Sequence, residues 1–230
     1  MPATAVLNPV LDLLFIRSTV TRAEPITARM RRLRVEADKL AGLDVRPGQQ
    51  VRVLVGGLTP RTYSVWRYDP AGAVELCVLD HPEGGPGAEW GRSVRVGEQV
   101  RLRKPEGTFT LRPDAAHHVF AGEETASVAF GAILDALPEG ARISGCVETD
   151  TAADRLPMRH SDRLDWLTRG GTSLPDGIRR LAPEPGGVAY VAGEARTVQA
   201  VRQLLVRELG WDRRSVLTKP FWAPGKKGLE

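Results

Sequence analysis

The sequence predicts two domains of different class: an N-terminal six-stranded antiparallel Greek-key β-barrel and a small C-terminal α/β domain with a parallel sheet. Residues 11–111 contain six strand-like apolar runs, separated by Gly- and Pro-containing turns and nearly free of helical spacing. After Pro113, strand-like runs alternate with helical ones. We therefore place the domains at 1–114 and 115–230.

The barrel strands follow from apolar residues at every second position. We expect a register change in the second strand, near Arg31 and Arg32, and a short helix within 85–94. The six strands are expected at 13–21, 26–37, 49–55, 61–68, 73–79 and 99–103.

The second domain shows the alternation expected of a parallel sheet with covering helices. The pattern is weak over 149–185, where 150–154 fits a loop and 164–167 fits either a short helix or a strand. Strands are expected at 117–121, 142–147 and 187–192, and amphipathic helices at 125–137 and 195–209.

Composition excludes several classes of protein. A hydrophobic content of 42% and a charged content of 26% are ordinary for a globular protein. The net charge of +4 is not gathered in long blocks, so we expect no nucleic-acid partner. Residues Met1–Pro9 lack the features of a secretion signal, and no apolar run nears 18 residues. We therefore expect a cytoplasmic protein with no membrane insertion.

Only two cysteines are present, Cys77 and Cys146, and both lie in apolar strand-like runs. They form no CxxC pair, so we expect two buried thiols and no zinc or iron–sulfur site. Any electron carrier would then have to be a bound cofactor.

The stretch from Arg61 to Val65 carries the clearest chemical signal. In a strand, Arg61 and Tyr63 point to one face and Thr62 and Ser64 to the other. A guanidinium can bind a diphosphate, a phenol ring can lie against a flat ligand, and a hydroxyl at a strand end can reach a ring nitrogen. These features suit a flavin, although any solvent-flanked strand could carry the same residues.

A Gly-rich turn comes soon after, from Gly85 to Gly91, and opens a short helix. Backbone N–H groups at such a turn favour an anion such as a flavin diphosphate. His81, at the end of the preceding strand, fits a neighbour of the flavin ring as well as an ordinary turn histidine.

Two strand ends in the second domain are candidates for a ligand site, because α/β sheets place ligands at the carboxyl ends of their strands. The run from Gly122 to Ala126 fits a strand–turn–helix junction without the G-x-G-x-x-G pattern, and Thr125 is a candidate N-cap. The helix start could receive a phosphate or a nicotinamide carboxamide. Gly193 and Glu194 end the third strand in the same way.

Together these segments resemble the siderophore-interacting protein family of flavin-dependent ferric-siderophore reductases, which are ferredoxin-reductase-like. The resemblance follows the order of the chain across most of its length. It rests on R-T-Y-S at 61–64, L-D-H and G-P-G-A-E-W-G within 79–91, A-G-E-E-T-A at 121–126, W-L-T-R-G-G at 166–171, A-G-E at 192–194 and K-P-F-W at 219–222.

The resemblance implies FAD as bound cofactor, NADH or NADPH as hydride donor, and a ferric siderophore as substrate. It implies no protein-bound metal and no catalytic acid–base pair, because the flavin itself passes two electrons on singly. The residues that it assigns to FAD are Arg61, Thr62, Tyr63, Ser64, Leu79, His81, Gly85, Ala88 and Trp90, and those that it assigns to the nicotinamide side are Gly122, Glu123, Glu124, Thr125, Gly193 and Glu194.

For the anionic siderophore we expect contacts from Trp222 and a basic rim, although a solvated basic tail would have the same sequence. The rim comprises Lys219, Lys226 and Lys227 with Arg213 and Arg214. Two further alternatives stay open: a flavin reductase of a biosynthetic cluster with a non-iron acceptor, and a siderophore- or flavin-binding protein without turnover. We expect a monomer or a weak dimer.

The choice between the two nucleotides is also open. Glu148, at the end of a predicted strand, could bind a ribose hydroxyl and favour NADH. Arg155 and Arg159 could instead pair with a 2′-phosphate and favour NADPH.

Overall fold

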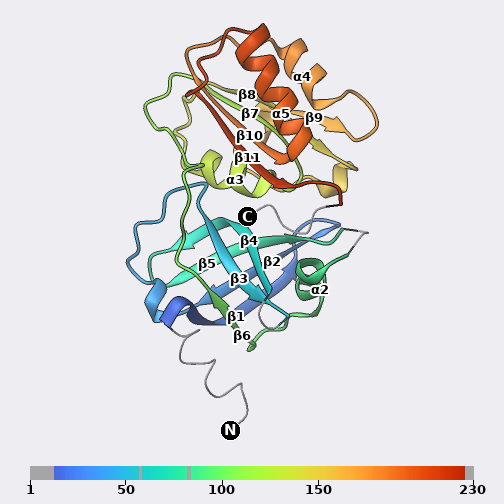
Figure 1. Ribbon diagram of the computed structural model, residues 1–230. Helices are drawn as coiled ribbons and strands as arrows, with labels where there is room; N and C mark the ends of the chain where they lie inside the picture. Colours follow the sequence, from blue (N-terminus) through green and yellow to red (C-terminus); the bar gives the residue numbers. More distant parts are fainter. Residues whose placement is uncertain (1–12, 57–58, 82–83, 226–230) are drawn as a thin grey trace. The chain divides into compact units, whose positions relative to one another are not determined.

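The computed structural model describes residues 13–56, 59–81 and 84–225, and the chain divides into two compact units, Met1–Thr108 and Phe109–Glu230 (Figure 1). This division lies earlier than the predicted boundary after residue 114. The reason is local packing: the Phe109 and Tyr190 ring centroids are 5.8 Å apart, and the Arg112 backbone N–H donates to the Tyr190 hydroxyl at 2.8 Å. The segment that follows Thr108 is therefore fixed within the second unit.

The first unit is a closed antiparallel barrel with the strand order β1-β2-β5-β4-β3-β6, which confirms the predicted class. Alternate residues of β3, Val51, Val53 and Val55, are fully buried in its interior. The strands are β1 Ile16–Pro25, β2 Met30–Glu36, β3 Gln50–Val55, β4 Thr59–Asp69, β5 Ala73–Leu79 and β6 Gln99–Leu102, with a 3₁₀ turn at Asp38–Leu40.

The hairpin of β1 and β2 differs from the prediction. The register change lies in β1, between Val20 and Arg22, and β2 pairs with β5 without interruption from Met30 to Glu36. The register change predicted near Arg31 and Arg32 is therefore wrong. The second strand also begins later than predicted, because the Thr27 hydroxyl accepts the Met30 backbone N–H at 3.0 Å and closes the turn.

The predicted short helix is present as α2, Pro86–Ser93, and packs on β5. A Cβ atom at Gly91 would lie 2.6 Å from Val78 Cγ1, so only glycine allows this approach. The Arg31 guanidinium donates to the Gly91 carbonyl and, at 3.1 Å, to the Arg92 carbonyl, which satisfies the end of the helix.

The second unit is a parallel five-stranded sheet with the order β11-β10-β7-β8-β9 (Figure 1). Phe120 of β7 and Tyr190 of β10 pack on one face, where Phe120 meets Phe130 of α3 at 5.2 Å between ring centroids. On the other face, α4 and α5 contact each other and cover the sheet. The strands are β7 His118–Glu123, β8 Ile143–Thr149, β9 Asp165–Thr168, β10 Val188–Glu194 and β11 Val216–Trp222, and the helices are α3 Ser127–Asp135, α4 Leu174–Leu181 and α5 Ala195–Gln203, which continues as a π-helix over Leu204–Glu208.

Three elements of this unit were not predicted or were left open. β9 is a strand, preceded by short 3₁₀ turns at Ala152–Asp154 and Ser161–Arg163. α4 begins at the N-cap Ser173, whose hydroxyl accepts the Asp176 N–H at 3.3 Å. β11 lies at the edge of the sheet, where Pro220 is tolerated although it lacks an N–H donor.

Candidate functional site

The predicted flavin residues of β4 lie against the first turn of α2. A Cβ atom at Gly87 would lie 2.8 Å from the Tyr63 hydroxyl and 3.7 Å from Arg61 Cγ. The helix N-cap, Gly85, adopts φ 115°, a conformation that favours glycine. The structure therefore brings Arg61, Tyr63 and the Gly-rich turn together, although they are distant in the sequence.

The Tyr63 side chain carries an unsatisfied buried polar group. Its buried hydroxyl has no hydrogen-bond partner among the described residues, and burial raises its pKa. Its ring lies 5.5 Å from the Trp90 ring, tilted by 40°. An unpaired buried hydroxyl is costly unless a ligand satisfies it. A guanidinium, an orphaned phenol and a glycine-lined helix start fit the diphosphate and flat ring of FAD.

The other predicted flavin residues divide into two groups. Ala88 and Trp90 are buried, and Trp90 packs in the barrel core, so these two side chains serve packing in the structure. Ser64 is buried next to Tyr63, and Thr62 pairs with Arg52 of β3. Leu79 is half-buried at the end of β5, and His81 is exposed just beyond it.

In the second unit, the predicted nicotinamide residues meet at the point where the strand order reverses. β7 leads to β8 and β9 on one side, whereas β10 and β11 lie on its other side, so the crevice between the carboxyl ends of β7 and β10 is the expected ligand site. Glu123 ends β7, and Gly193 and Glu194 end β10.

Glu123 is fully buried at this crevice and has three donors. Its carboxyl group accepts the Thr125 N–H at 3.1 Å, the Thr125 hydroxyl, and the Trp222 indole N–H at 3.1 Å. Loss of hydration is the largest influence on its pKa and raises it, against the opposing effect of these hydrogen bonds. Burial and hydrogen bonding thus act on the pKa of this carboxyl group in opposite directions at the carboxyl edge of the sheet.

Gly193 makes this arrangement possible. Its φ is +125°, and a Cβ atom would lie 2.7 Å from Glu123 Oε1. Its neighbour Glu194 is the N-cap of α5, where the carboxylate accepts the N–H groups of Arg196 at 2.9 Å and Thr197 at 2.8 Å. Although burial opposes ionisation, these hydrogen bonds lower the pKa of Glu194. The pKa is thus raised at Glu123 and lowered at the neighbouring Glu194.

Arg169, which follows β9, is a functional candidate that sequence reasoning missed. Its guanidinium lies 3.8 Å from a Glu124 oxygen and 3.6 Å from a Glu148 oxygen, and it donates to Asp150. Only the W-L-T-R-G-G motif hinted at it, because its three partners come from other parts of the chain.

The structure contradicts the predicted N-cap role of Thr125 and the 2′-phosphate role considered for Arg159. α3 begins at Ser127 without a side-chain cap, because the Thr125 hydroxyl is directed to Glu123 instead. Arg159 donates to the carbonyls of Asp135 at 3.1 Å and Leu137 at 3.0 Å, at the end of α3, and so lies at the opposite edge of the sheet from Glu148. It cannot pair with a ribose phosphate there.

Two members of the predicted basic rim, Arg213 and Arg214, lie away from the crevice. Arg213 and Arg214 precede β11, whereas Trp222 ends it, so the strand separates them from the crevice by about 20 Å. Arg213 instead lines a hollow of about 290 Å³ with Arg202 and Arg207 beside α5. Lys219 is half-buried within β11, and Lys226 and Lys227 lie outside the described residues.

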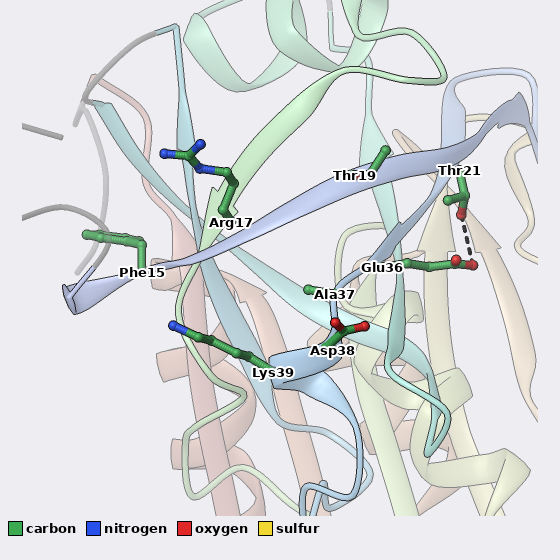
Figure 2. Close-up of a pocket in the computed structure, with 8 residues that line it drawn as sticks. All are labelled: Phe15, Arg17, Thr19, Thr21, Glu36, Ala37, Asp38 and Lys39. Carbon is green, nitrogen blue, oxygen red and sulfur yellow. Dashed lines mark hydrogen bonds between the residues drawn. The ribbon is translucent and has the colours of Figure 1, made fainter. Parts of the chain in front are cut away.

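A larger hollow, of about 550 Å³, lies on the barrel and is lined by none of the predicted site residues (Figure 2). It is lined along β1 and around the start of the 3₁₀ turn, where the Thr21 hydroxyl donates to Glu36 at 3.0 Å. Its lining residues are Phe15, Arg17, Thr19, Thr21, Glu36, Ala37, Asp38 and Lys39.

The remaining observations concern metals, thiols and membranes. Cys77 and Cys146 are free and buried, and burial raises the pKa of both thiols to about 12. Within the ranges that the structure describes, no group of three or more His, Cys, Asp or Glu side chains could hold a metal ion. Over the same ranges, no helix combines the length and apolar character needed to span a membrane.

Comparison with known proteins points to one family. Residues 115–225 match the family model for siderophore-interacting proteins. The ferric vibriobactin reductase ViuB of Vibrio cholerae is 30% identical over 202 residues, which cover 83% of this chain and 74% of the relative.

Solved structures agree with this result. A siderophore utilization protein from T. fusca shares 25% identity, with a TM-score of 0.80 and coverage of 94% of this chain and 95% of the other. Phthalate dioxygenase reductase, at 16% identity, has the same fold with a TM-score of 0.77, covering 92% of this chain and 70% of its own. The ferredoxin-reductase-like fold is thereby confirmed.

Proposed function

Because the chain belongs to the siderophore-interacting protein family, we propose that it reduces siderophore-bound Fe(III) to Fe(II) with NAD(P)H, using bound FAD, and that it releases the iron in the cytoplasm. The name of its relative from V. cholerae, a ferric vibriobactin reductase, supports this reaction class. Fe(II) binds hard oxygen ligands more weakly than Fe(III), so reduction would loosen the iron from its carrier.

The observation that carries the proposal is the cradle formed by Arg61, Tyr63 and the first turn of α2. We infer that the first unit binds FAD there. Arg61 would neutralise the diphosphate together with the N–H groups of the turn, and the Tyr63 hydroxyl would gain the partner that it lacks. Ser64 and His81 remain candidates for contacts with the ring.

For NAD(P)H we propose the crevice between β7 and β10 in the second unit. Because glycine has no side chain, Gly122 allows Ala126 and the Ala192 carbonyl to lie close, and Gly193 allows the buried Glu123 to approach. Glu194 caps the start of α5 beside them. Glu123 would present a polar group to the nicotinamide there, held in place by the Thr125 and Trp222 donors. Trp222 and Lys219 of β11 stay our candidates for contact with the siderophore.

The different roles of the cofactor and of the protein residues follow from the number of electrons transferred. A nicotinamide gives two electrons as hydride and Fe(III) accepts one, and bound FAD would supply that conversion. The residues of the chain would bind and orient the partners, and we assign none of them as a catalytic acid or base.

The test is a visible spectrum of the purified protein, with added FAD if it is colourless, recorded anaerobically during additions of NAD(P)H and then a ferric siderophore. We expect flavin absorption that bleaches with the nucleotide and returns with the iron complex, while a chelator captures Fe(II). Arg61→Ala should weaken FAD binding by at least tenfold, because it removes a charge from the diphosphate site. Arg46→Ala, an exposed arginine of the same unit, is the matched control.

Two results would contradict the proposal. A protein that takes up no FAD yet binds the siderophore would be a binding protein without turnover. A protein that bleaches with nucleotide but transfers electrons only to free flavin or another acceptor would be a flavin reductase of a different pathway.

A further inference from the structure

We propose that the protein selects NADH over NADPH, and that Glu148 and Asp150 are the residues that determine this preference. The inference rests on the proposed function, because it concerns the nucleotide that enters the crevice of the second unit. It adds which nucleotide is used and which side chains distinguish the two.

The position of Glu148 is the first part of the argument. It pairs with Glu123 across the parallel strands β7 and β8, one residue before the end of β8, and Asp150 follows directly after that strand. In doubly wound α/β folds, an acidic side chain at the end of the second strand binds the hydroxyls of the adenosine ribose. Both carboxylates are thus placed where the two nucleotides differ, at the ribose 2′ position.

A second observation at the same edge points to a ligand and does not involve the acids. Ser127, the first residue of α3, is 1% exposed, and its hydroxyl has no hydrogen-bond partner among the described residues. α3 starts directly after the turn that follows β7, so this orphaned group lies at the same end of the sheet as Glu148. A bound nucleotide would account for it.

The charge around Arg169 decides which nucleotide fits. Its single guanidinium is shared by three carboxylates, those of Glu124, Glu148 and Asp150, so acidic side chains outnumber it at this point. A 2′-phosphate carries about two negative charges and would be repelled there. The free ribose of NADH would instead donate its hydroxyls to carboxylate oxygens.

The cations that could have favoured NADPH are engaged elsewhere. Arg159 is bound at the opposite edge of the sheet, to the carbonyls at the end of α3. The Arg155 guanidinium lies over the Trp166 ring, 5.4 Å from its centroid, and Arg169 is already surrounded by acids. The site thus contains carboxylate acceptors for the hydroxyls of a ribose. For a 2′-phosphate, each of the three arginines, Arg155, Arg159 and Arg169, is already engaged by another group.

The experiment measures binding of ADP-ribose and 2′-phospho-ADP-ribose by titration calorimetry, which requires no turnover. We expect the wild-type protein to bind ADP-ribose at least tenfold more tightly. In Glu148→Gln/Asp150→Asn, the loss of two charges should raise affinity for the phosphorylated compound by about tenfold per charge, which abolishes or reverses the preference. Glu184→Gln, which neutralises an exposed acid paired with Arg142, is the matched control and should leave the preference unchanged.

The outcomes separate this inference from the proposed function. Equal or tighter binding of the phosphorylated compound by the wild-type protein overturns the inference and leaves the reductase intact. A preference for ADP-ribose that the double variant retains, while its circular dichroism shows a native fold, overturns the assignment to Glu148 and Asp150. If neither compound binds, both this inference and the nucleotide site of the proposed function are wrong.

Discussion

The buried carboxyl group of Glu123 should make the stability of the second unit depend on pH in a direction unusual for a glutamate. Its pKa is raised in the folded protein, chiefly by burial, above the value of about 4.3 expected for an unfolded chain. The folded state therefore holds this proton more tightly than the unfolded state. Its stabilising contribution is complete below about pH 4.3 and is lost as pH rises through the folded pKa.

The magnitude follows from proton linkage. One group can change the free energy of unfolding by at most about 1.4 kcal/mol per pH unit. For a unit of this size that is about 4–5 °C in Tm per pH unit. Glu123→Gln keeps the shape of the neutral acid and cannot ionise. The difference in Tm between the wild-type protein and this variant should therefore decline as pH rises from 4.5 to 7.

Glu194 supplies an internal control with the opposite sign. Its pKa is lowered, because its carboxylate accepts the N–H groups at the start of α5. Its contribution is present above about pH 4.3 and is lost as pH falls through the folded pKa. Thermal unfolding of wild type, Glu123→Gln and Glu194→Gln from pH 3.5 to 7.5 should give difference curves of opposite slope. A flat curve for Glu123→Gln above pH 4.5 would show that its three donors hold it ionised, and would refute the reasoning.

Three further predictions concern single contacts. Gly193→Ala should lower the free energy of unfolding by about 2–4 kcal/mol, because its Cβ would meet Glu123 Oε1 at 2.7 Å in a backbone conformation that disfavours alanine. The control Gly210→Ala has open space around it and should lower the free energy by only about 1 kcal/mol. Urea unfolding measures both. Tyr63→Phe should leave the Tm of the flavin-free protein unchanged or raise it, since it removes an unpaired buried hydroxyl, while fluorescence titration should show roughly tenfold weaker FAD binding; unchanged FAD affinity would exclude the hydroxyl as a flavin contact. Trp222→Phe should cost about 1 kcal/mol and extend the pH dependence of Glu123 to higher pH, because it removes a donor that lowers that pKa; an unshifted pH profile would argue against the indole contact.

The fold was largely predictable because its signals are local. The alternation of Val51, Val53 and Val55 indicates a strand with one buried face, and it can be recognised without knowledge of the rest of the chain. β11 was missed because Pro220 argues against a strand, and only the edge position makes it acceptable. α4 was missed because the run from Pro175 to Gly177 resembles a turn, although Ser173 and Pro175 are also residues that start a helix.

The candidate site was predictable in its residue types but not in its contacts. The R-T-Y-S and A-G-E-E-T-A motifs identify Tyr63 and Glu123, yet no local pattern shows that one hydroxyl lacks a partner and that one carboxyl group is buried. Arg169 shows the limit most clearly. Its partners Glu124, Glu148 and Asp150 follow or end other strands, and only pairing of those strands brings them to one guanidinium.

The arginines of the connection between β8 and β9 have a consequence for proteolysis. Besides the contacts of Arg159 with the end of α3, Arg163 donates to the carbonyls of Ala141 at 2.8 Å and Glu139 at 3.0 Å. Trypsin cleaves after arginine, but it must first draw the side chain into its own specificity pocket. At these two positions the side chain that the protease needs is the one that fastens the connection to the rest of the unit. Although this stretch contains little regular secondary structure, tryptic cleavage after Arg159 and Arg163 should be slow until the unit itself unfolds.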